Sequence, residues 1–358
     1  MSDIVFILGA GASRQAGAPL MSDFLDKAAD LLVTGRVNKR RIQFEKVFSA
    51  IGGLQQVHSK AQLDLNNIES VFTAFELAKI IQRLPGVPTS EIPEVIAALK
   101  QLIVSTLERT MQFPVSERDV LPPKPYGEFA SFLGDLQKEQ TQTTSVSVIT
   151  FNYDIAIDLA LVRAGFEVSY SLTKHSKHRT SMDLLKLHGS LNWAEEHVTK
   201  KIIPVALSSY LREPYALTDT DLVYLTLSEK FDAFFGCQSP QVHVKPEAVI
   251  VPPSWNKADY HHALSDIWAA AAEHLAAAQH IFIVGYSLPE TDAFFRHLFA
   301  LGCVGPSPLR SIVVFNPDSS VDGRFQSLLG PGALARYQFH PITFEEAIKH
   351  LRKSFKIG

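Results

Sequence analysis

Apolar residues occur along this chain in two patterns, short runs with few interruptions and longer stretches with helical spacing. The short runs cover residues 4–8, 146–150, 184–187, 280–284 and 311–315. Such runs are typical of strands buried on both faces, so each one predicts a strand. Between them, apolar residues recur every three or four positions and predict amphipathic helices. Strands that alternate with helices form mainly parallel sheets, so the sequence predicts a Rossmann-like, doubly wound α/β fold.

The longest helical part of the sequence separates the first two predicted strands. Helices are predicted over residues 19–33, 36–50, 66–84, 93–111 and 126–138, with Ser22 as the N-cap of the first. We therefore expect one domain over residues 1–358 that carries a helical insertion or subdomain at 35–145. Residues 195–247 are rich in prolines and polar residues and predict a second, irregular insertion. Near the end of the chain, residues 343–346 read Thr-Phe-Glu-Glu and predict a capping box that opens the last helix.

Five of the predicted strands end in polar or glycine-rich turns. These turns are Gly9–Ser13, Thr150–Asp154, His188–Ser190, Gly285–Ser287 and Asn316–Asp318. Parallel strands end at the same edge of a sheet, and ligands of such sheets bind there. The five turns are therefore expected to gather at one rim and to form a binding site. The alternative is that turns after strands are polar in any protein.

The turn after the first strand is the most informative of the five. Gly9, Ala10, Gly11, Ala12 and Ser13 follow a buried strand and open a helix, which is the order that a phosphate site needs. The usual dehydrogenase fingerprint is absent, because Arg14 stands where the third glycine belongs and no strand ending in an acid follows. The Lys-Ser/Thr pair of nucleoside triphosphatases is absent too. The sequence thus favours a dinucleotide-type loop in an unusual context, with a plain glycine-rich turn as the alternative.

The composition narrows the class of protein. The chain has 358 residues, 46% of them hydrophobic, and a net charge of −3, which favours a packed globular protein without a nucleic-acid or membrane surface. Its two cysteines are too few for a disulfide framework or a four-cysteine zinc site. The densest histidine group, at positions 261, 262, 274 and 280, does not place two histidines on one helix face with an acid, so we expect no metal. The N-terminus enters a strand without a signal peptide, and we expect a cytoplasmic protein.

The ordered turn motifs resemble those of sirtuin-like NAD-binding domains. The resemblance rests on Gly-Ala-Gly-Ala-Ser at 9–13, Thr-Phe-Asn-Tyr-Asp at 150–154, Leu-His-Gly-Ser at 187–190, Gly-Tyr-Ser at 285–287 and Asn-Pro-Asp at 316–318. It is closest to the bacterial sirtuin-like branch, for which Leu-His-Gly-Ser-Leu-Asn-Trp (187–193) and Gly-Tyr-Ser-Leu-Pro (285–289) are characteristic. The motifs are short, but they stand in order and span most of the chain.

The resemblance implies a role for each turn. The backbone of Gly9–Ser13 would cradle the NAD pyrophosphate, Gly285 and Ser287 would contact phosphate and ribose, and Asn316 would hold the adenine ribose. Asn152 would position the attacking water or the nicotinamide ribose, Asp154 would face the nicotinamide amide, and His188 would act as general base. Without the resemblance, Asn152 and Asp154 fit equally a strand-exit turn whose aspartate caps the next helix, and His188 fits a histidine satisfied beside a glycine turn.

Two departures from the sirtuin pattern bear on the reaction. The four-cysteine zinc module of the deacylases is missing, with only Cys237 in that region, and Leu-Met-Ser at 20–22 stands where the family has Asp-Phe-Arg. Both departures favour NAD hydrolysis to nicotinamide and ADP-ribose, as in the sirtuin-like proteins of bacterial anti-phage defence. NAD is then substrate rather than cofactor, and a homo-oligomer or a separately encoded ATPase or sensor partner is expected to control the activity. The alternatives are an NAD-dependent deacylase or ADP-ribosyltransferase, and a non-catalytic NAD or ADP-ribose sensor.

Overall fold

The computed structural model divides by its internal contacts into two compact units. The first unit comprises residues 1–16, 113–190 and 261–358, and the second comprises residues 17–112 and 191–260. The residues that the structure describes are 3–55, 63–116, 119–139, 145–172, 180–196, 198–207, 216–217, 222–224, 244–251, 258–290, 292–305 and 307–357.

The first unit is built on a seven-stranded sheet with the order β14-β13-β12-β1-β4-β6-β5. Every pair of neighbouring strands is parallel. From β1, the chain adds β4 and β6 on one side and β12, β13 and β14 on the other, which is the doubly wound order with its switch point between β1 and β12. The predicted fold class is therefore confirmed. The strands are β1 (Ile4–Leu8), β4 (Val146–Thr150), β5 (Glu167–Ser169), β6 (Ser181–Lys186), β12 (His280–Val284), β13 (Ser311–Phe315) and β14 (Tyr337–His340).

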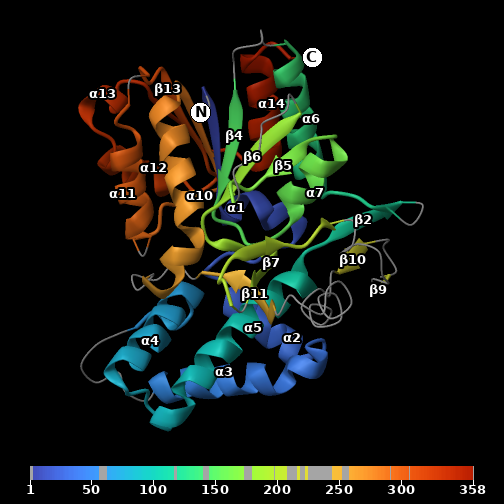
Figure 1. Ribbon diagram of the computed structural model, residues 1–358, viewed down its shortest axis with the longest axis vertical. Helices are drawn as coiled ribbons and strands as arrows, with labels where there is room; N and C mark the ends of the chain where they lie inside the picture. The colour runs from blue at the N-terminus through green and yellow to red at the C-terminus, as the bar shows by residue number, and fades with distance from the viewer. Residues whose placement is uncertain are drawn as a thin grey trace. The chain divides into compact units, whose positions relative to one another are not determined.

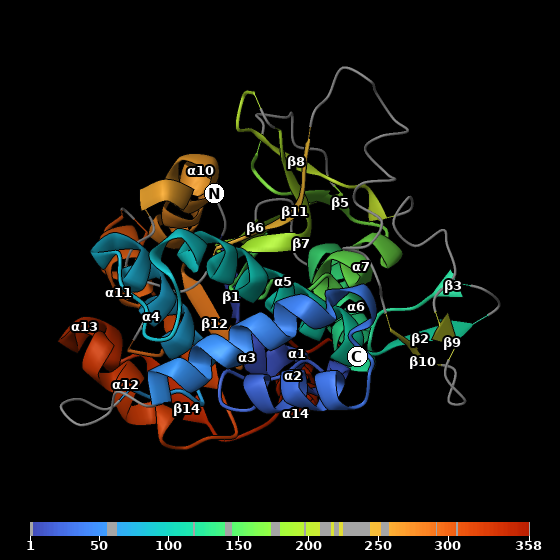
Figure 2. The same cartoon turned by 90° about the horizontal axis from the view of Figure 1, so that it is seen from below.

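Helices cover both faces of this sheet. α6 (Lys124–Glu139), α7 (Ala156–Arg163) and α14 (Phe344–Ser354) lie on one side, and α10 (Ala258–Ala277) and α11 (Ala293–Gly302) lie on the other (Figures 1 and 2). All five residues of β1 are buried because both faces are covered, which explains the unbroken apolar run. Phe6 of β1 packs edge-on against Phe129 of α6 and stacks on Phe282 of β12, with both ring centroids 5.2 Å away. The remaining elements are α1 (Ala10–Ser13), the hairpin β2 (Phe113–Ser116) and β3 (Asp119–Val120), α12 (Val321–Leu328) and α13 (Pro331–Leu334).

The second unit combines a helical cluster with short strands. Its helices are α2 (Phe24–Val33), α3 (Arg41–Gln55), α4 (Ile68–Ile81) and α5 (Ile92–Thr110), and α5 contacts the other three. A three-stranded sheet has the order β11-β7-β8, formed by β11 (Val244–Ile250), most of β7 (Gly189–Glu196) and β8 (Ile202–Pro204). β9 (Ala216–Leu217) pairs antiparallel with β10 (Leu222–Tyr224).

Several predicted element boundaries need correction. Ser22 is not the N-cap of α2; that position is occupied by Asp23, whose carboxylate accepts the N–H of Leu20 at 2.6 Å and so closes the turn before the helix. The helix predicted at 36–50 is α3 at 41–55, and the short strand predicted at 184–187 is β6, which begins at Ser181. The capping box at Thr343 and Glu346 is confirmed by both of its hydrogen bonds.

The division into units bears on the predicted insertions, which stay predictions. α6 falls inside the predicted insertion 35–145, but it belongs to the first unit, whereas α2 to α5 belong to the second. Within 195–247, the described residues include β8, β9, β10 and the start of β11, and much of 208–243 lies outside the described residues. None of the helices in the described part of the chain has the length and hydropathy needed to cross a membrane.

Candidate active site

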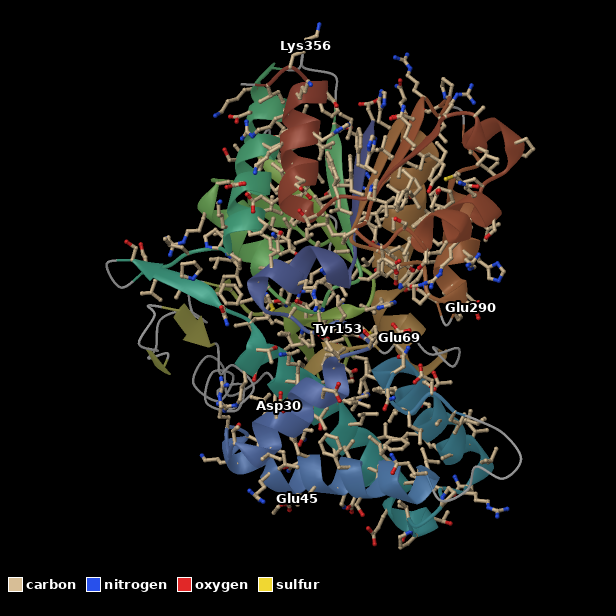
Figure 3. The ribbon with its side chains drawn as sticks, turned by 180° about the vertical axis from the view of Figure 1, so that it is seen from behind. Asp30, Glu45, Glu69, Tyr153, Glu290 and Lys356 are labelled. Carbon is tan, nitrogen blue, oxygen red and sulfur yellow. The ribbon has the colours of Figure 1, made fainter. Side chains whose placement is uncertain are left out.

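The five polar turns follow five strands of the same parallel sheet, namely β1, β4, β6, β12 and β13. They therefore lie at the carboxyl edge of the sheet, as the sequence predicts. Figure 3 illustrates this edge: Tyr153 and Glu290 lie there, whereas Lys356, near the C-terminus, lies at the opposite end of the sheet. All of the contacts described below are made within the first unit.

Three glycines let the turns after β1 and β12 pack closely against each other at the switch point of the sheet. The N–H of Gly9 donates to Val284 O at 3.0 Å, and the N–H of Gly11 donates to Gly285 O at 2.8 Å. A Cβ added at Gly9 would lie 2.4 Å from the Cα of Tyr286, and one added at Gly11 would lie 2.8 Å from Gly285 O. Gly285 itself has a φ of +62°, in the left-handed region that favours glycine. The contact between the two turns thus accounts for these glycines by itself.

The predicted phosphate cradle lies on the short helix α1. Its residues Ala10, Gly11, Ala12 and Ser13 follow Gly9, which has extended backbone at the N-cap. The N–H of Ala12 donates back to Gly9 O at 3.0 Å. The N–H groups of Gly9, Gly11 and Ala12 are therefore used inside the protein, and the role of this turn toward a phosphate stays a prediction.

Ser13 is the centre of a buried hydrogen-bond network at the rim. Its hydroxyl donates to Asp154 Oδ2 at 2.6 Å and accepts from Asn152 Nδ2 at 2.9 Å. The Tyr126 hydroxyl, from α6, lies 2.7 Å from Ser13 Oγ. Because a serine hydroxyl has one proton and gives it to Asp154, Tyr126 must be the donor in this third contact. Burial raises the pKa of Tyr126 well above its ordinary value, which keeps this donor protonated.

The same network fixes the orientation of Asn152. Its Nδ2 donates to Gly9 O at 2.9 Å and to Ser13 Oγ, and it lies 3.3 Å from Tyr126 Oη. Its backbone N–H donates to Thr150 Oγ1, and that hydroxyl donates to Leu8 O across the strand pair. All three neighbours of Nδ2 are acceptors, so they assign the amide nitrogen to this side and leave Oδ1 as an acceptor for another group.

Asp154 is held from two directions. Its Oδ1 accepts the N–H of Ala156 at 2.9 Å, at the start of α7, while Oδ2 accepts the proton of Ser13. Asp154 is therefore not the N-cap of α7, as the alternative interpretation had it; Ile155 holds that position, and Asp154 closes the turn just before it. The predicted contact of Asp154 with a nicotinamide amide stays a prediction. Burial raises the pKa of the Asp154 carboxyl above its ordinary value, and Lys186 and the Ser13 hydrogen bond lower it in part.

Behind Asp154 lies a buried ion pair that the sequence did not reveal. Lys186, the last residue of β6, has no exposed surface; its Nζ donates to Asp154 O at 2.5 Å and to Asp158 Oδ2 at 2.8 Å. The other oxygen of Asp158 accepts the Tyr170 hydroxyl at 2.7 Å. Lys186 therefore ties the turn after β4 to the end of β6, two residues before His188.

His188 lies among aromatic rings on the neighbouring strand end. It is 5% exposed, and its ring centroid is 5.2 Å from Phe151 and 6.1 Å from Tyr153. Its Nε2 lies 4.0 Å from Asp292 Oδ2. Ser190, two residues on, donates its hydroxyl proton to Tyr153 O at 3.3 Å, which joins the turns after β4 and β6.

The turns after β12 and β13 are also joined. Asn316 Nδ2 donates to Tyr286 O at 3.3 Å, and Asn316 Oδ1 accepts the N–H of Asp318 at 3.0 Å. The carbonyl of Ser287 accepts from Arg324 at 3.1 Å. Asn316 thus shapes these two turns, and contact of Ser287 or Asn316 with a ribose stays a prediction.

The structure therefore brings Ser13, Asn152 and Asp154 together, and it places His188 on the neighbouring strand end. Sequence reasoning missed Tyr126, Lys186 and Asp292. Tyr126 follows a proline-rich loop without a motif of its own, and nothing in the sequence signals its contact with Ser13. Lys186 could have been recognised from the sequence, because a lysine at the end of a buried apolar strand needs a buried anionic partner.

Solved structures of Sir2 homologues are similar to this chain. A Sir2 homologue mutant in complex with ADP-ribose shares 13% identity at a TM-score of 0.40, covering 99% of this chain and 94% of that one. A Sir2 homologue in complex with NAD shares 15% identity at a TM-score of 0.40, covering 98% and 90%. A Sir2 protein bound to an acetylated peptide shares 13% identity at a TM-score of 0.39, covering 99% and 94%. No protein-family model matches the chain, and no curated protein does.

Proposed function

We propose that this chain hydrolyses NAD to nicotinamide and ADP-ribose. The observation that carries the proposal is the oriented amide of Asn152, whose Nδ2 is engaged by Gly9 O, Ser13 Oγ and Tyr126 Oη. An asparagine fixed in this way presents a preorganised acceptor at the carboxyl edge of a doubly wound sheet, where dinucleotides bind. The ordered sirtuin-like motifs favour NAD as the dinucleotide.

The residues at the rim supply the groups that the reaction needs. The bond between ribose C1′ and the pyridinium nitrogen breaks, and its electron pair leaves with nicotinamide through an oxocarbenium-like state. Asn152 Oδ1 accepts a hydrogen bond from the attacking water or from a ribose hydroxyl and so holds it in place. The water oxygen bonds to C1′, and its proton passes to His188 as general base. Histidine suits this step because its imidazole titrates near neutral pH.

The remaining predicted contacts place the rest of NAD along the same edge. In this proposal the turn at Gly9–Ser13 faces the pyrophosphate, Gly285 and Ser287 contact phosphate and ribose, and Asn316 lies beside the adenine ribose. From the nicotinamide end of NAD to the adenine end, these contacts follow the order of the strands in the sheet, from β4 through β1 and β12 to β13. In this proposal Asp154 faces the nicotinamide amide, and the hydrogen bonds that its oxygens accept from Ser13 and Ala156 fix the orientation of its carboxylate. No metal is part of the proposal.

Two other functions remain as alternatives. A protein deacylase or an ADP-ribosyltransferase would use the same bond cleavage with a different acceptor. The whole sequence holds only two cysteines, which disfavours the zinc-bearing deacylases. An NAD or ADP-ribose sensor would bind without turnover. The presence of both Asn152 and His188 favours an enzyme over a sensor.

The proposed biological role is that of a cytoplasmic anti-phage effector that depletes NAD and stops growth. Such an activity must be silent until triggered, so we propose that homo-oligomerisation or a separately encoded ATPase or sensor protein controls it. A monomer that is fully active in isolation would contradict this part of the proposal.

The experiment follows nicotinamide and ADP-ribose by chromatography after NAD is added to purified protein. The protein is tested alone, with an acetylated peptide, and with the products of the neighbouring genes. Hydrolysis predicts equal amounts of nicotinamide and free ADP-ribose without peptide, and loss of both in Asn152→Ala and His188→Ala. Release only with peptide would establish the deacylase, and NAD binding without release in every mixture would establish the sensor.

A further inference from the structure

One acidic side chain at the rim has no role in the proposed reaction, although it faces the proposed base. Asp292 precedes α11 and is 1% exposed. Its Oδ2 lies 4.0 Å from His188 Nε2 and accepts the hydroxyl proton of Tyr286 at 2.7 Å. Its Oδ1 accepts the N–H of Phe295 at 3.3 Å, which caps the helix. The carboxylate thus uses one oxygen for the helix and turns the other toward His188 and Tyr286.

The surroundings of this pair are aromatic. Phe151 stacks on Tyr286 with ring centroids 4.3 Å apart and an interplanar angle of 11°, and it meets His188 edge-on. Phe295 packs edge-on against both Phe151 and Tyr286, at 5.2 and 5.1 Å. Rings on several sides exclude water, so the interaction between a carboxylate and an imidazolium is screened less here than at the surface.

We propose that Asp292 is the positioning residue of His188, with Tyr286 fixing the carboxylate in turn. Asp292 keeps Nε2 of the imidazole on its side, so that Nδ1 is the nitrogen that meets the water proton. It then stabilises the imidazolium that forms when His188 takes that proton. This inference rests on the proposed function for its role in turnover, but the pairing itself is a property of the free protein.

Titratable side chains from several elements gather around His188 and Asp292. Asp292 comes from the turn before α11, Tyr286 from the turn after β12, and Tyr153 from the turn after β4. From α10, Trp268 donates its indole N–H to Leu187 O at 3.0 Å and adds no charge. Asp292 is the carboxylate that faces Nε2 of this imidazole, at 4.0 Å.

The first experiment is the pH dependence of NAD hydrolysis in Asp292→Asn and Tyr286→Phe. The amide introduced by Asp292→Asn would keep an oxygen for the helix cap and lose the charge, so the helix start survives. Neutral His188 is the active base, and a facing carboxylate favours the protonated imidazole. Removal of the charge lets the imidazole lose its proton at lower pH, so the acid limb of the pH–rate profile moves down by on the order of one pH unit. The rate on the alkaline plateau falls about tenfold or more.

The chain offers a matched control in a second buried pair. His274 Nε2 lies 3.2 Å from Asp183 Oδ2, and both side chains are buried between β6 and α10, away from the rim. Asp183→Asn makes the same chemical change beside a histidine and is expected to lower the melting temperature while leaving the pH–rate profile unchanged. Equal profiles for Asp183→Asn and Asp292→Asn would overturn the proposal, because a general effect on folding would then explain both.

A second readout separates this inference from the proposed function. The imidazole signals of His188, assigned by comparison with His188→Gln, are followed by NMR as the pH is changed. The titration midpoint of His188 is expected to fall in Asp292→Asn and to stay in place in Asp183→Asn. If wild type releases no nicotinamide but the midpoint falls, the pairing stands and the proposed function fails. An unmoved midpoint in folded Asp292→Asn overturns the pairing whatever the activity.

Discussion

Two buried serines in the first unit allow a sharp test of the rim network. Ser13 is 1% exposed, and its hydroxyl lies within hydrogen-bond distance of Asp154, Asn152 and Tyr126. Ser147 of β4 has no exposed surface, and its Oγ has no hydrogen-bond partner in the part of the chain that the structure describes. Replacement by alanine removes the same atom in both cases, and the two variants differ chiefly in what that atom contacts.

The two replacements are expected to change the free energy of unfolding differently. Ser13→Ala removes one hydrogen bond to a charged group, which contributes about 1.5–3 kcal/mol, and two neutral ones of about 1 kcal/mol each. These contributions are not additive, and we expect a loss of about 2–4 kcal/mol. Ser147→Ala removes a buried hydroxyl without a partner and is expected to be neutral or to stabilise by up to about 1 kcal/mol. Urea unfolding followed by circular dichroism measures both.

The pH dependence of the free energy of unfolding provides a second test of the Ser13 network. The pKa of Asp154 is raised in the folded state, chiefly by burial, and the Ser13 hydrogen bond lowers it in part. Ser13→Ala removes that bond, so the folded-state pKa rises further above the unfolded value. The native state then binds more protons than the unfolded state, and stability falls as the pH rises through this window. The loss caused by Ser13→Ala is therefore expected to be larger at pH 7 than at pH 4. Equal losses at both pH values, or equal effects of the two serine variants, would refute this reasoning.

Three further predictions concern other parts of the first unit. Lys186→Met should lower the free energy of unfolding, measured in urea, by about 3–5 kcal/mol, because it leaves a buried carboxylate unpaired. The double variant Lys186→Met/Asp158→Leu should recover most of this stability, because the buried carboxylate is then removed as well. Gly9→Ala should lower the melting temperature because its Cβ would lie 2.4 Å from backbone, whereas Gly323→Ala, where nothing lies within 4 Å, should be neutral or slightly stabilising. Burial and a neighbouring histidine lower the pKa of His340 in the folded state, so the stability of wild type should fall as the pH drops below about 6.5. Between pH 7.5 and 5.5, the melting temperature of His340→Phe should therefore fall less than that of wild type.

The sheet could be predicted from the sequence because its strands are buried on both faces. The residues of β1, β4, β12 and β13 match the apolar runs, since helices on both sides of the sheet leave no face for polar residues. The common edge for the five turns followed from the parallel topology alone. β5 and β14 were not predicted, because these edge strands are short and lack a continuous apolar run.

The site could be predicted only as far as the motifs reach. Ser13, Asn152 and Asp154 come from motifs, whereas Tyr126 joins them across 113 residues of sequence, a contact that no local pattern encodes. Asp292 has a local signal as a helix cap, but its distance to His188 depends on how β6 and β12 are arranged in the sheet. Sequence patterns thus located the strand ends, and the side chains that orient the motif residues required the structure.

The most direct test of the proposed function is a time course of NAD observed by proton NMR with purified wild type, Asn152→Ala and Ser147→Ala. The samples are measured with and without the products of the neighbouring genes. The proposal predicts that the resonances of free nicotinamide replace those of NAD with wild type and with Ser147→Ala, and that Asn152→Ala leaves NAD intact while remaining folded. Unchanged NAD with wild type in every mixture, or equal turnover by Asn152→Ala, would contradict it.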